Sequence, residues 1–156
     1  MKNFLICLVL IMSFQVYSQN PEELKVKNTI KEFFKGFHAQ DSVLILKTVH
    51  TEIKMQSVDS RRGGKAKLDT SKFENFLNSI LSIPETVTFN EKLLDYDIKI
   101  DGNMAHAWTP YEFYLNGKLS HTGVNSFQLF KDEDDWKIIY IVDTRNKPTP
   151  SLPKGG

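Results

Sequence analysis

Cysteine is almost absent from this chain, which has one Cys among its 156 residues. That residue, Cys7, lies inside the apolar run Phe4–Val16, which follows Lys2 and leads into Tyr17-Ser18-Gln19. A short basic start, an apolar stretch of this length and a small residue near its end are typical of a secretory signal peptide. We therefore predict a cleaved signal peptide at residues 1–19 and a secreted or periplasmic protein. Without cysteine, the mature domain must be held together by its core and not by disulfides.

An excess of either charge is also lacking, with 20 Lys and Arg against 19 Asp and Glu. Nucleic-acid-binding domains need a basic face, and anionic membranes attract clusters of basic residues. We therefore expect no nucleic-acid partner, and no membrane partner after the signal peptide is removed.

Motifs for phosphate binding and nucleophilic catalysis are missing as well. The sequence has no glycine-rich phosphate loop, no nucleophile elbow and no catalytic triad motif. His106, Glu112 and His121 would form a metal-ligand set only through the fold, because no short ligand spacing links them. We therefore predict neither a cofactor nor a metal.

The first half of the chain has the apolar spacing of three helices. The first starts at Asn20-Pro21, a capping residue followed by a proline. The second, at 42–49, follows Asp41, and the third has Ser71 as its predicted cap. A strand at 51–58 and a flexible basic loop at 61–67 are predicted between them. The apolar faces of the first and third helices consist of Val26, Ile30, Phe33, Phe34, Phe37, Phe73, Phe76, Leu77, Ile80 and Leu81.

Strand-like alternation fills the second half of the chain. Asn116-Gly117 marks a tight hairpin turn between strands at 103–115 and 118–130. Pro110 cannot donate to a β-ladder, so it lies at a sheet edge or marks a bulge. Helices followed by a meander predict an α+β fold, a cone-like curved antiparallel sheet with three N-terminal helices packed on its concave face. One domain spans 20–146, and residues 147–156 form a disordered tail.

Three segments, together with the order of the elements, resemble the nuclear-transport-factor-2-like (SnoaL-like) superfamily, whose fold is cystatin-like. Gly36–Asp41 is similar to that family's junction between its first two helices, and Lys131–Ile139 to its charged turn followed by Trp-Lys-Ile. The run Trp108–Lys118, with His121-x-Gly-x-Asn after it, resembles an uncharacterised branch of secreted bacterial members. The resemblance covers Pro21–Thr144 and implies the fold, whereas family members include isomerases, dehydratases, epoxide hydrolases, cyclases and plain binders.

The hairpin turn at Asn116-Gly117 predicts which strand face lines a pocket. A two-residue turn fixes the pairing of the flanking strands, and alternation then brings one set of side chains to a common face. This set pairs Glu112 with His121, Trp108 with Asn125, His106 with Phe127, and Met104 with Leu129. An apolar wall with a few converging polar groups is typical of small-molecule sites. A bulge at Pro110 would instead turn Tyr111 and Phe113 inward, so Glu112 and Tyr111 are alternatives for one role.

These patterns give two sets of candidate site residues. We expect ligand contacts from Trp108, His121, Asn125, Phe127, His106, Tyr140, Met55 and Phe34. Asn125 is informative because a buried amide left without a partner costs about 1–3 kcal/mol, so it must bond protein, ligand or water. The catalytic candidates are His121, Glu112 and Asp143 as general bases and Tyr111 as the donor to a developing oxyanion.

Three functions fit these features. The first is a secreted protein that binds a small apolar or aromatic molecule in a partly apolar pocket. The second is a cofactor-free enzyme of the isomerase or dehydratase type, with His or Asp as the general base. The third is an interaction module that forms a homodimer through the outer sheet face, where Tyr111, Phe113, Val124 and Phe130 would make an apolar patch.

Overall fold

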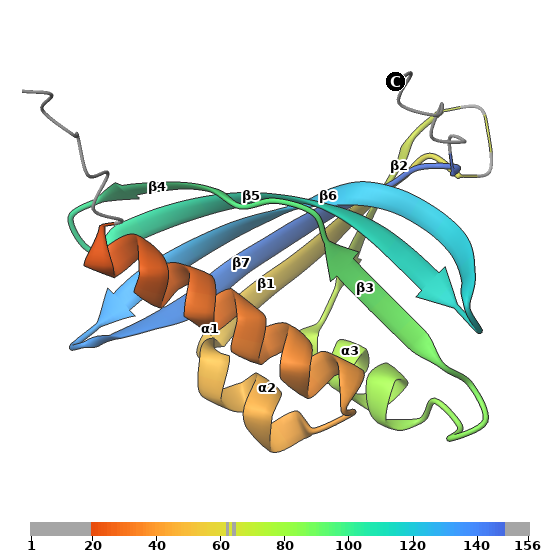
Figure 1. Cartoon of the computed structure of the whole chain (residues 1–156), viewed down its shortest axis with the longest axis horizontal. Coiled ribbons are helices and arrows are strands. Elements are labelled where there is room, and N and C mark those ends of the chain that lie inside the picture. Colours follow the sequence, from red (N-terminus) through yellow and green to blue (C-terminus); the bar gives the residue numbers. More distant parts are fainter. Residues whose placement is uncertain (1–19, 62, 64, 149–156) are drawn as a thin grey trace, which may run out of the picture.

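The computed structural model describes residues 20–61, 63 and 65–148. The predicted signal peptide lies outside the described residues, as does most of the predicted tail. The described part contains three helices and a seven-stranded sheet, with the first two strands between the second and third helices (Figure 1). None of these helices has both the length and the apolar character needed to cross a membrane.

The helices form where capping residues and apolar spacing predicted them. They are α1 (Pro21–His38), α2 (Ser42–Thr48) and α3 (Phe73–Leu81). The side chain of Asn20 caps α1 by accepting a hydrogen bond from the backbone N–H of Glu22 at 3.0 Å, and Asp41 caps α2 in the same way. The predicted cap of α3 is wrong, because α3 starts after Lys72 without a side-chain cap and Ser71 ends a strand.

One sheet contains all seven strands of the described chain. They are β1 (Val49–Asp59), β2 (Lys67–Ser71), β3 (Phe89–Leu93), β4 (Asp97–Asp101), β5 (Met104–Leu115), β6 (Lys118–Asp132) and β7 (Asp135–Arg145). The strand order is β2-β1-β7-β6-β5-β3, with β4 pairing separately with β5. All pairs are antiparallel except β1 with β7, which run parallel, so the sheet is mixed. The predicted loop at 61–67 runs into β2, a strand that the sequence pattern did not reveal.

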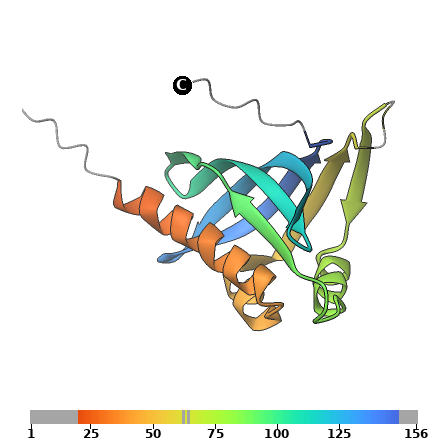
Figure 2. The same cartoon turned by 45° about the vertical axis from the view of Figure 1, so that its right-hand side comes forward.

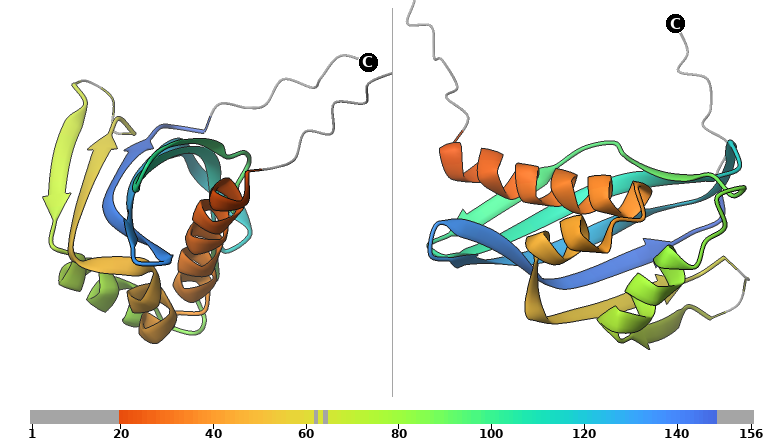
Figure 3. Two further views of the ribbon diagram at one scale, coloured as in Figure 1. Left: turned by 90° about the vertical axis from the view of Figure 1, so that its left-hand side faces the viewer. Right: turned by 90° about the horizontal axis from the view of Figure 1, so that it is seen from below.

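The sheet curls, and α1 lies across its concave side (Figures 2 and 3). The helix turns its buried face, which includes Val26, Ile30 and Phe33, toward the sheet. Apolar side chains of β5, β6 and β7 meet it and complete the core, with Phe127 and Ile138 fully buried. The α+β architecture and the curved sheet with helices on its concave side are thus those the sequence predicted.

One extra residue sets the register of the long hairpin. Asn116 and Gly117 both have positive φ, at 50° and 73°, as the predicted tight turn requires. The pairing then shifts, because Tyr114 pairs with Leu119 whereas Phe113 pairs with His121. Ser120 is therefore an extra residue in β6, a bulge that the sequence analysis did not place there.

Pro110 does not cause a bulge, and β5 is not an edge strand. The carbonyl of Pro110 accepts a hydrogen bond at 2.8 Å from the N–H of Leu94, a residue that lies between the end of β3 and the start of β4. The N and O atoms of one strand residue point to the same side, so the missing N–H of Pro110 faces the break between these two strands. The proline is tolerated there because no ladder donor is needed.

Candidate functional site

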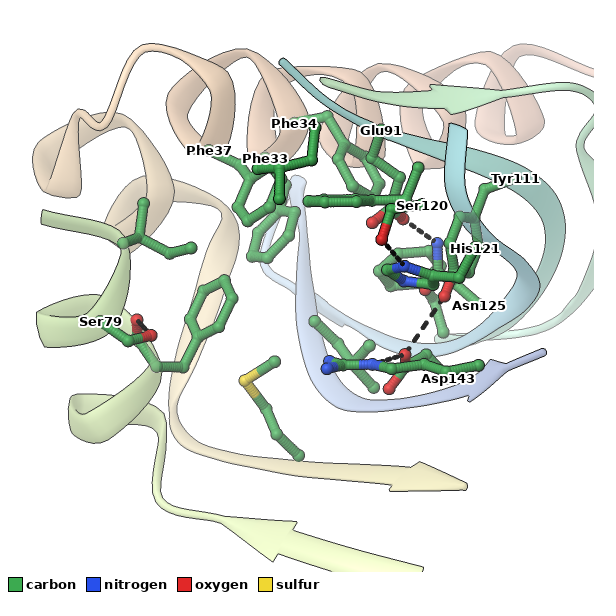
Figure 4. Close-up of a pocket in the computed structure, with 18 of the residues that line it drawn as sticks. Phe33, Phe34, Phe37, Ser79, Glu91, Tyr111, Ser120, His121, Asn125 and Asp143 are labelled. Atoms are coloured by element: carbon green, nitrogen blue, oxygen red, sulfur yellow. Dashed lines mark hydrogen bonds and ion pairs between the residues drawn. The ribbon is translucent and has the colours of Figure 1, made fainter. Parts of the chain in front are cut away.

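A cavity of about 380 Å³ lies between α1, α3 and the concave side of the sheet (Figure 4). Most of its wall is apolar: Phe33, Phe34, Phe37, Met55, Phe76, Ile80, Phe113, Leu115, Phe127 and Ile141. Its polar groups come from α3, β3, β5, β6, β7 and the turn after β1: Arg61, Ser79, Glu91, Tyr111, Ser120, His121, Asn125, Asp143 and Arg145. This combination, an aromatic wall with converging polar groups, is that of small-molecule sites.

The bulge at Ser120 decides which side chains of β5 face the cavity. It brings the odd-numbered residues of β5 to the same face as His121 and Asn125, so Tyr111 and Phe113 point inward. Of the two alternatives left open by the sequence, Tyr111 therefore lies in the wall. The predicted bulge at Pro110 is wrong, because the bulge lies at Ser120 in β6. Its effect is the predicted one, since Tyr111 and Phe113 face inward.

The same shift turns three expected residues outward, and their predicted placement is wrong. Trp108 is 45 % exposed, and the Nε2 atom of His106 lies 3.0 Å from the hydroxyl of Ser126 on the outer face. Glu112 accepts a hydrogen bond from the hydroxyl of Tyr114 at 2.9 Å and lies outside the cavity.

Tyr140 is also misplaced by the prediction. The pairing of β6 with β7 shifts between Gln128 and Leu129, so Ile138 and Ile141 both turn inward while Tyr140 lies on the other face. Its hydroxyl donates to the side chain of Gln56. The other expected residues do line the cavity together: Phe34, Met55, Tyr111, His121, Asn125, Phe127 and Asp143.

Glu91 is the cavity residue that sequence reasoning missed. Its carboxylate accepts a hydrogen bond from the amide of Asn125 at 2.7 Å, and its backbone N–H donates to Nε2 of His38 at 2.9 Å. Burial raises the pKa of Glu91 to about 7, and the negative charge of Asp143 adds to this rise. The sequence did contain a signal, since Phe89 and Leu93 flank Glu91 at alternate positions and place it on the apolar face of β3.

His121 is held between two aromatic rings. Its ring stacks on Phe113 with centroids 4.8 Å apart and meets the edge of Tyr111 at 5.8 Å. Its Nδ1 atom lies 3.2 Å from the hydroxyl of Ser120. Burial lowers the pKa of His121 to about 4, helped by the positive charge of Arg61. The imidazole is therefore neutral at physiological pH.

Tyr111 and Asp143 join β5 to the end of β7. The hydroxyl of Tyr111 donates to the carbonyl of Thr144 at 2.9 Å and lies 3.4 Å from Asp143. Asp143 in turn accepts from Nε of Arg145 at 2.8 Å. Burial raises the pKa of Tyr111 far above its usual value, and the charge of Asp143 acts in the same direction. This hydroxyl is therefore a donor and not a base.

Within the described residues, no group of three or more His, Cys, Asp or Glu side chains has the arrangement of a metal site. Glu91 can exchange a proton near neutral pH, and the amide of Asn125 retains a second N–H for a ligand.

Comparison with known proteins identifies the fold. No family model matches the sequence, and no curated protein matches it either. Solved structures do match: a nuclear-transport-factor-2-like protein of Cytophaga hutchinsonii has a TM-score of 0.63 at 15 % identity, over 81 % of this chain and 98 % of that one. A Nostoc punctiforme protein of unknown function with a cystatin-like fold gives 0.60 at 16 % identity, over 84 % and 93 %.

A third similar structure is that of a Streptomyces avermitilis protein of the same fold family, described as a proposed dehydratase. Its TM-score is 0.61 at 14 % identity, over 80 % of this chain and 95 % of that one. The chain thus has the nuclear-transport-factor-2-like, or SnoaL-like, fold that its sequence resembled. Similarity at these identities establishes the fold and no particular activity.

Proposed function

We propose that the protein binds a small molecule with an apolar or aromatic body in the cavity, and that it does so outside the cytoplasm after removal of residues 1–19. The observation that carries this proposal is the cavity itself, about 380 Å³ in volume and walled by phenyl rings from two helices and the sheet. Burying apolar ligand surface contributes about 25 cal/mol per Å². Asn125 and Glu91 supply polar contacts that orient the ligand.

A blocking substitution at the cavity rim tests this proposal. Ser79 and Ser82 are both exposed, and each donates its hydroxyl to the carbonyl three residues earlier, at the end of α3. Ser79 lines the cavity, whereas Ser82 does not. We expect Ser79→Trp to weaken binding of the fluorescent apolar probe N-phenyl-1-naphthylamine about tenfold or more, as loss of ~1.4 kcal/mol does.

Ser82→Trp is the matched control and should bind the probe like the wild type. Equal probe affinity in both variants, or no binding by the wild type to any apolar probe, would contradict the proposal. A shift of the melting temperature on addition of the probe gives an independent readout.

A second candidate function is proton transfer on a carbon acid, and the position of Glu91 favours it. A carboxyl with a pKa of about 7 inside a cavity suits a general base at neutral pH. The carboxylate would take a proton from the carbon beside a ketone, the charge would move to the ketone oxygen, and Asn125 would donate to that oxygen. His121 and Asp143 fit the role less well, because one is neutral and weakly basic and the other is paired with Arg145.

Hydrogen exchange of 2-tetralone in D2O, followed by NMR, tests this candidate. We expect wild-type protein to speed exchange of the protons beside the carbonyl and Glu91→Gln to slow it about 100-fold, the usual contribution of a general base. Glu112→Gln removes an outward carboxyl from β5 and should leave exchange unchanged. Exchange at the uncatalysed rate with wild-type protein would dismiss catalysis of this type and leave the binding proposal intact.

A further inference from the structure

The charges at the polar end of the cavity do not balance. Arg61 pairs with Asp59 at 2.6 Å, and Arg145 pairs with Asp143 at 2.8 Å. Glu91 forms no ion pair with any residue of the described chain, and its carboxylate bonds only to the uncharged amide of Asn125. Among the described residues, Glu91 is therefore a carboxyl group without a paired cation, in a site where burial makes an unpaired charge costly.

The surroundings of Glu91 suit a positive charge that comes from outside the chain. The groups that face it are His38 from α1, Tyr111 from β5, Asn125 and His121 from β6, and Asp143 and Arg145 from β7. His38 uses its Nε2 to accept from the backbone of Glu91, so neither that histidine nor Asn125 brings a charge. The effect of Asp143 on Glu91 exceeds that of Arg145, so the neighbouring field opposes a second negative charge there.

Most apolar residues of the cavity wall are aromatic. Phe33, Phe34 and Phe37 from α1 line the same cavity as Glu91 and Asn125 (Figure 4), and Phe127 forms edge-to-face contacts with the first two. The faces of phenyl rings carry partial negative charge and attract cations. An aromatic wall next to a lone carboxylate is a combination found where proteins bind organic ammonium groups.

We propose that the ligand of this cavity carries one protonated amine on an aromatic or aliphatic body, and that the ammonium group ion pairs with Glu91. This inference rests on the proposed binding function and assigns a chemical class to the ligand. An ammonium donates up to three hydrogen bonds, and the free oxygen of Glu91 and the amide oxygen of Asn125 are acceptors at the same end of the cavity. The body of the ligand then lies among the phenyl rings.

An anionic ligand gains less from the same site. Both guanidinium groups at the polar end are already neutralised by an aspartate, so a second anion would compete with Asp59 or Asp143. It would also meet Glu91 without a compensating cation. A neutral ligand would bind only through hydrogen bonds to Glu91 and Asn125, without the attraction between opposite charges.

Three probes with one ring system separate these possibilities. We expect 2-naphthylmethylamine to bind about tenfold more tightly than 2-naphthalenemethanol at pH 7.5 in isothermal titration calorimetry, and 2-naphthoate to bind more weakly than the alcohol. Glu91→Gln should reduce the ratio of amine affinity to alcohol affinity to about one. Glu112→Gln, which neutralises the outward carboxyl of β5, should leave that ratio as it is in the wild type.

Proton release gives a second readout on the unmodified protein. Below the pKa of about 7, Glu91 holds a proton that it must lose to pair with an ammonium ion. At pH 6, binding of the amine should therefore release close to one proton, measured by calorimetry in buffers of different ionisation enthalpy, whereas the alcohol should release none. Equal or tighter binding of the alcohol or the acid, or no proton release with the amine, would overturn this inference. Failure of all three probes to bind would instead contradict the proposed binding function.

Discussion

At the scale of single residues, the pKa values of two cavity groups, Glu91 and His121, are shifted in opposite directions. The pKa of Glu91 is raised to about 7, so the folded state holds this proton more tightly than the unfolded chain does. The pKa of His121 is lowered to about 4, so the unfolded chain holds that proton more tightly. Between about pH 4.5 and 6.5, a rise in pH lowers the free energy of unfolding through Glu91 and increases it through His121. The two effects therefore cancel in part and cannot be separated in the wild type alone.

Replacing Glu91 by Gln separates them. As the pH rises from about 4.5 to 7, the wild type must ionise a buried carboxyl that the variant lacks. We expect its free energy of unfolding to fall relative to Glu91→Gln by about 2–3 kcal/mol, since each pKa unit is worth ~1.4 kcal/mol and partial solvent contact reduces the effect. Urea unfolding of both proteins at several pH values measures this difference.

The corresponding comparison with His121→Gln should have the opposite sign. Below pH 6.5 the unfolded wild type takes up a proton that the folded state resists, so the wild type loses stability relative to this variant as the pH falls toward 4. If the difference in free energy of unfolding between wild type and Glu91→Gln did not change with pH, the pKa of Glu91 would not be raised in the folded protein.

A cavity residue can be predicted from the sequence where burying its side chain has an obvious energetic cost. It is missed where its burial depends on residues far away in the sequence. Asn125 was found because an amide in mid-strand must have a partner. Glu91 was missed because β3 is only five residues long and because the neighbours of Glu91 in the chain, Asn90 and Lys92, are polar or charged. Nothing in the sequence near Glu91 reveals that His38, on the first helix, binds its backbone.

At the scale of elements, the helices were predictable and the strand register was not. The apolar spacing of α1 repeats over 18 residues, so one exception does not change its buried face. Side chains of a strand alternate between its two faces, so a register shift of one residue exchanges the faces. The single extra residue Ser120 therefore changes which residues of β5, from Met104 to Phe113, share a face with His121 and Asn125. Trp108, His106 and Glu112 were misplaced for this one reason.

The crossing of β7 over Gly123 gives a prediction at this scale. A Cβ atom at Gly123 would lie 1.8 Å from the carbonyl oxygen of Thr144, which also accepts the hydroxyl of Tyr111. We expect Gly123→Ala to lower the free energy of unfolding by about 3 kcal/mol, at the upper end of overpacking costs, because the obstacle is backbone. Thr122→Ala, on the outward face of the same strand, is the control and should cost much less. Equal denaturation midpoints for the two variants would refute the close approach.

At the scale of the whole molecule, the outer face of the sheet exposes large apolar side chains. The prediction that Tyr111 and Phe113 belong to an apolar patch on this face is wrong, because both side chains face the cavity. In their place the outer face exposes Met104 by 54 %, Trp108 by 45 % and Phe130 by 39 %, on the paired strands β5 and β6. We propose a homodimer through this patch, since burying it would remove large apolar side chains from water.

Light scattering coupled to gel filtration tests the dimer. We expect the wild type to have twice the subunit mass at high concentration and Trp108→Glu to be monomeric, because a buried unpaired carboxylate is costly. Leu46→Glu changes a side chain of similar exposure on α2, away from this face, and should leave the dimer intact. A monomeric wild type at every concentration would dismiss the proposal.

The overall architecture followed from the order of helices and strands, yet one pairing did not. β1 and β7 are far apart in the sequence and run parallel, and local patterns do not report such a contact. The short strand β2 was not predicted, because four of its five residues are exposed and leave no alternating apolar pattern. Such a pairing depends on contacts between segments far apart in the sequence, which local patterns do not contain.

The central position of β7 limits the order in which the chain can fold. β7, the last strand of the described residues, separates β1 from β6 and contacts both, so the two halves of the sheet do not pair with each other directly. A nascent chain that has emerged as far as β6 can form the β5–β6 hairpin and α1, but β1 and β2 remain detached. The two halves of the sheet can therefore join only once β7 pairs with both β1 and β6.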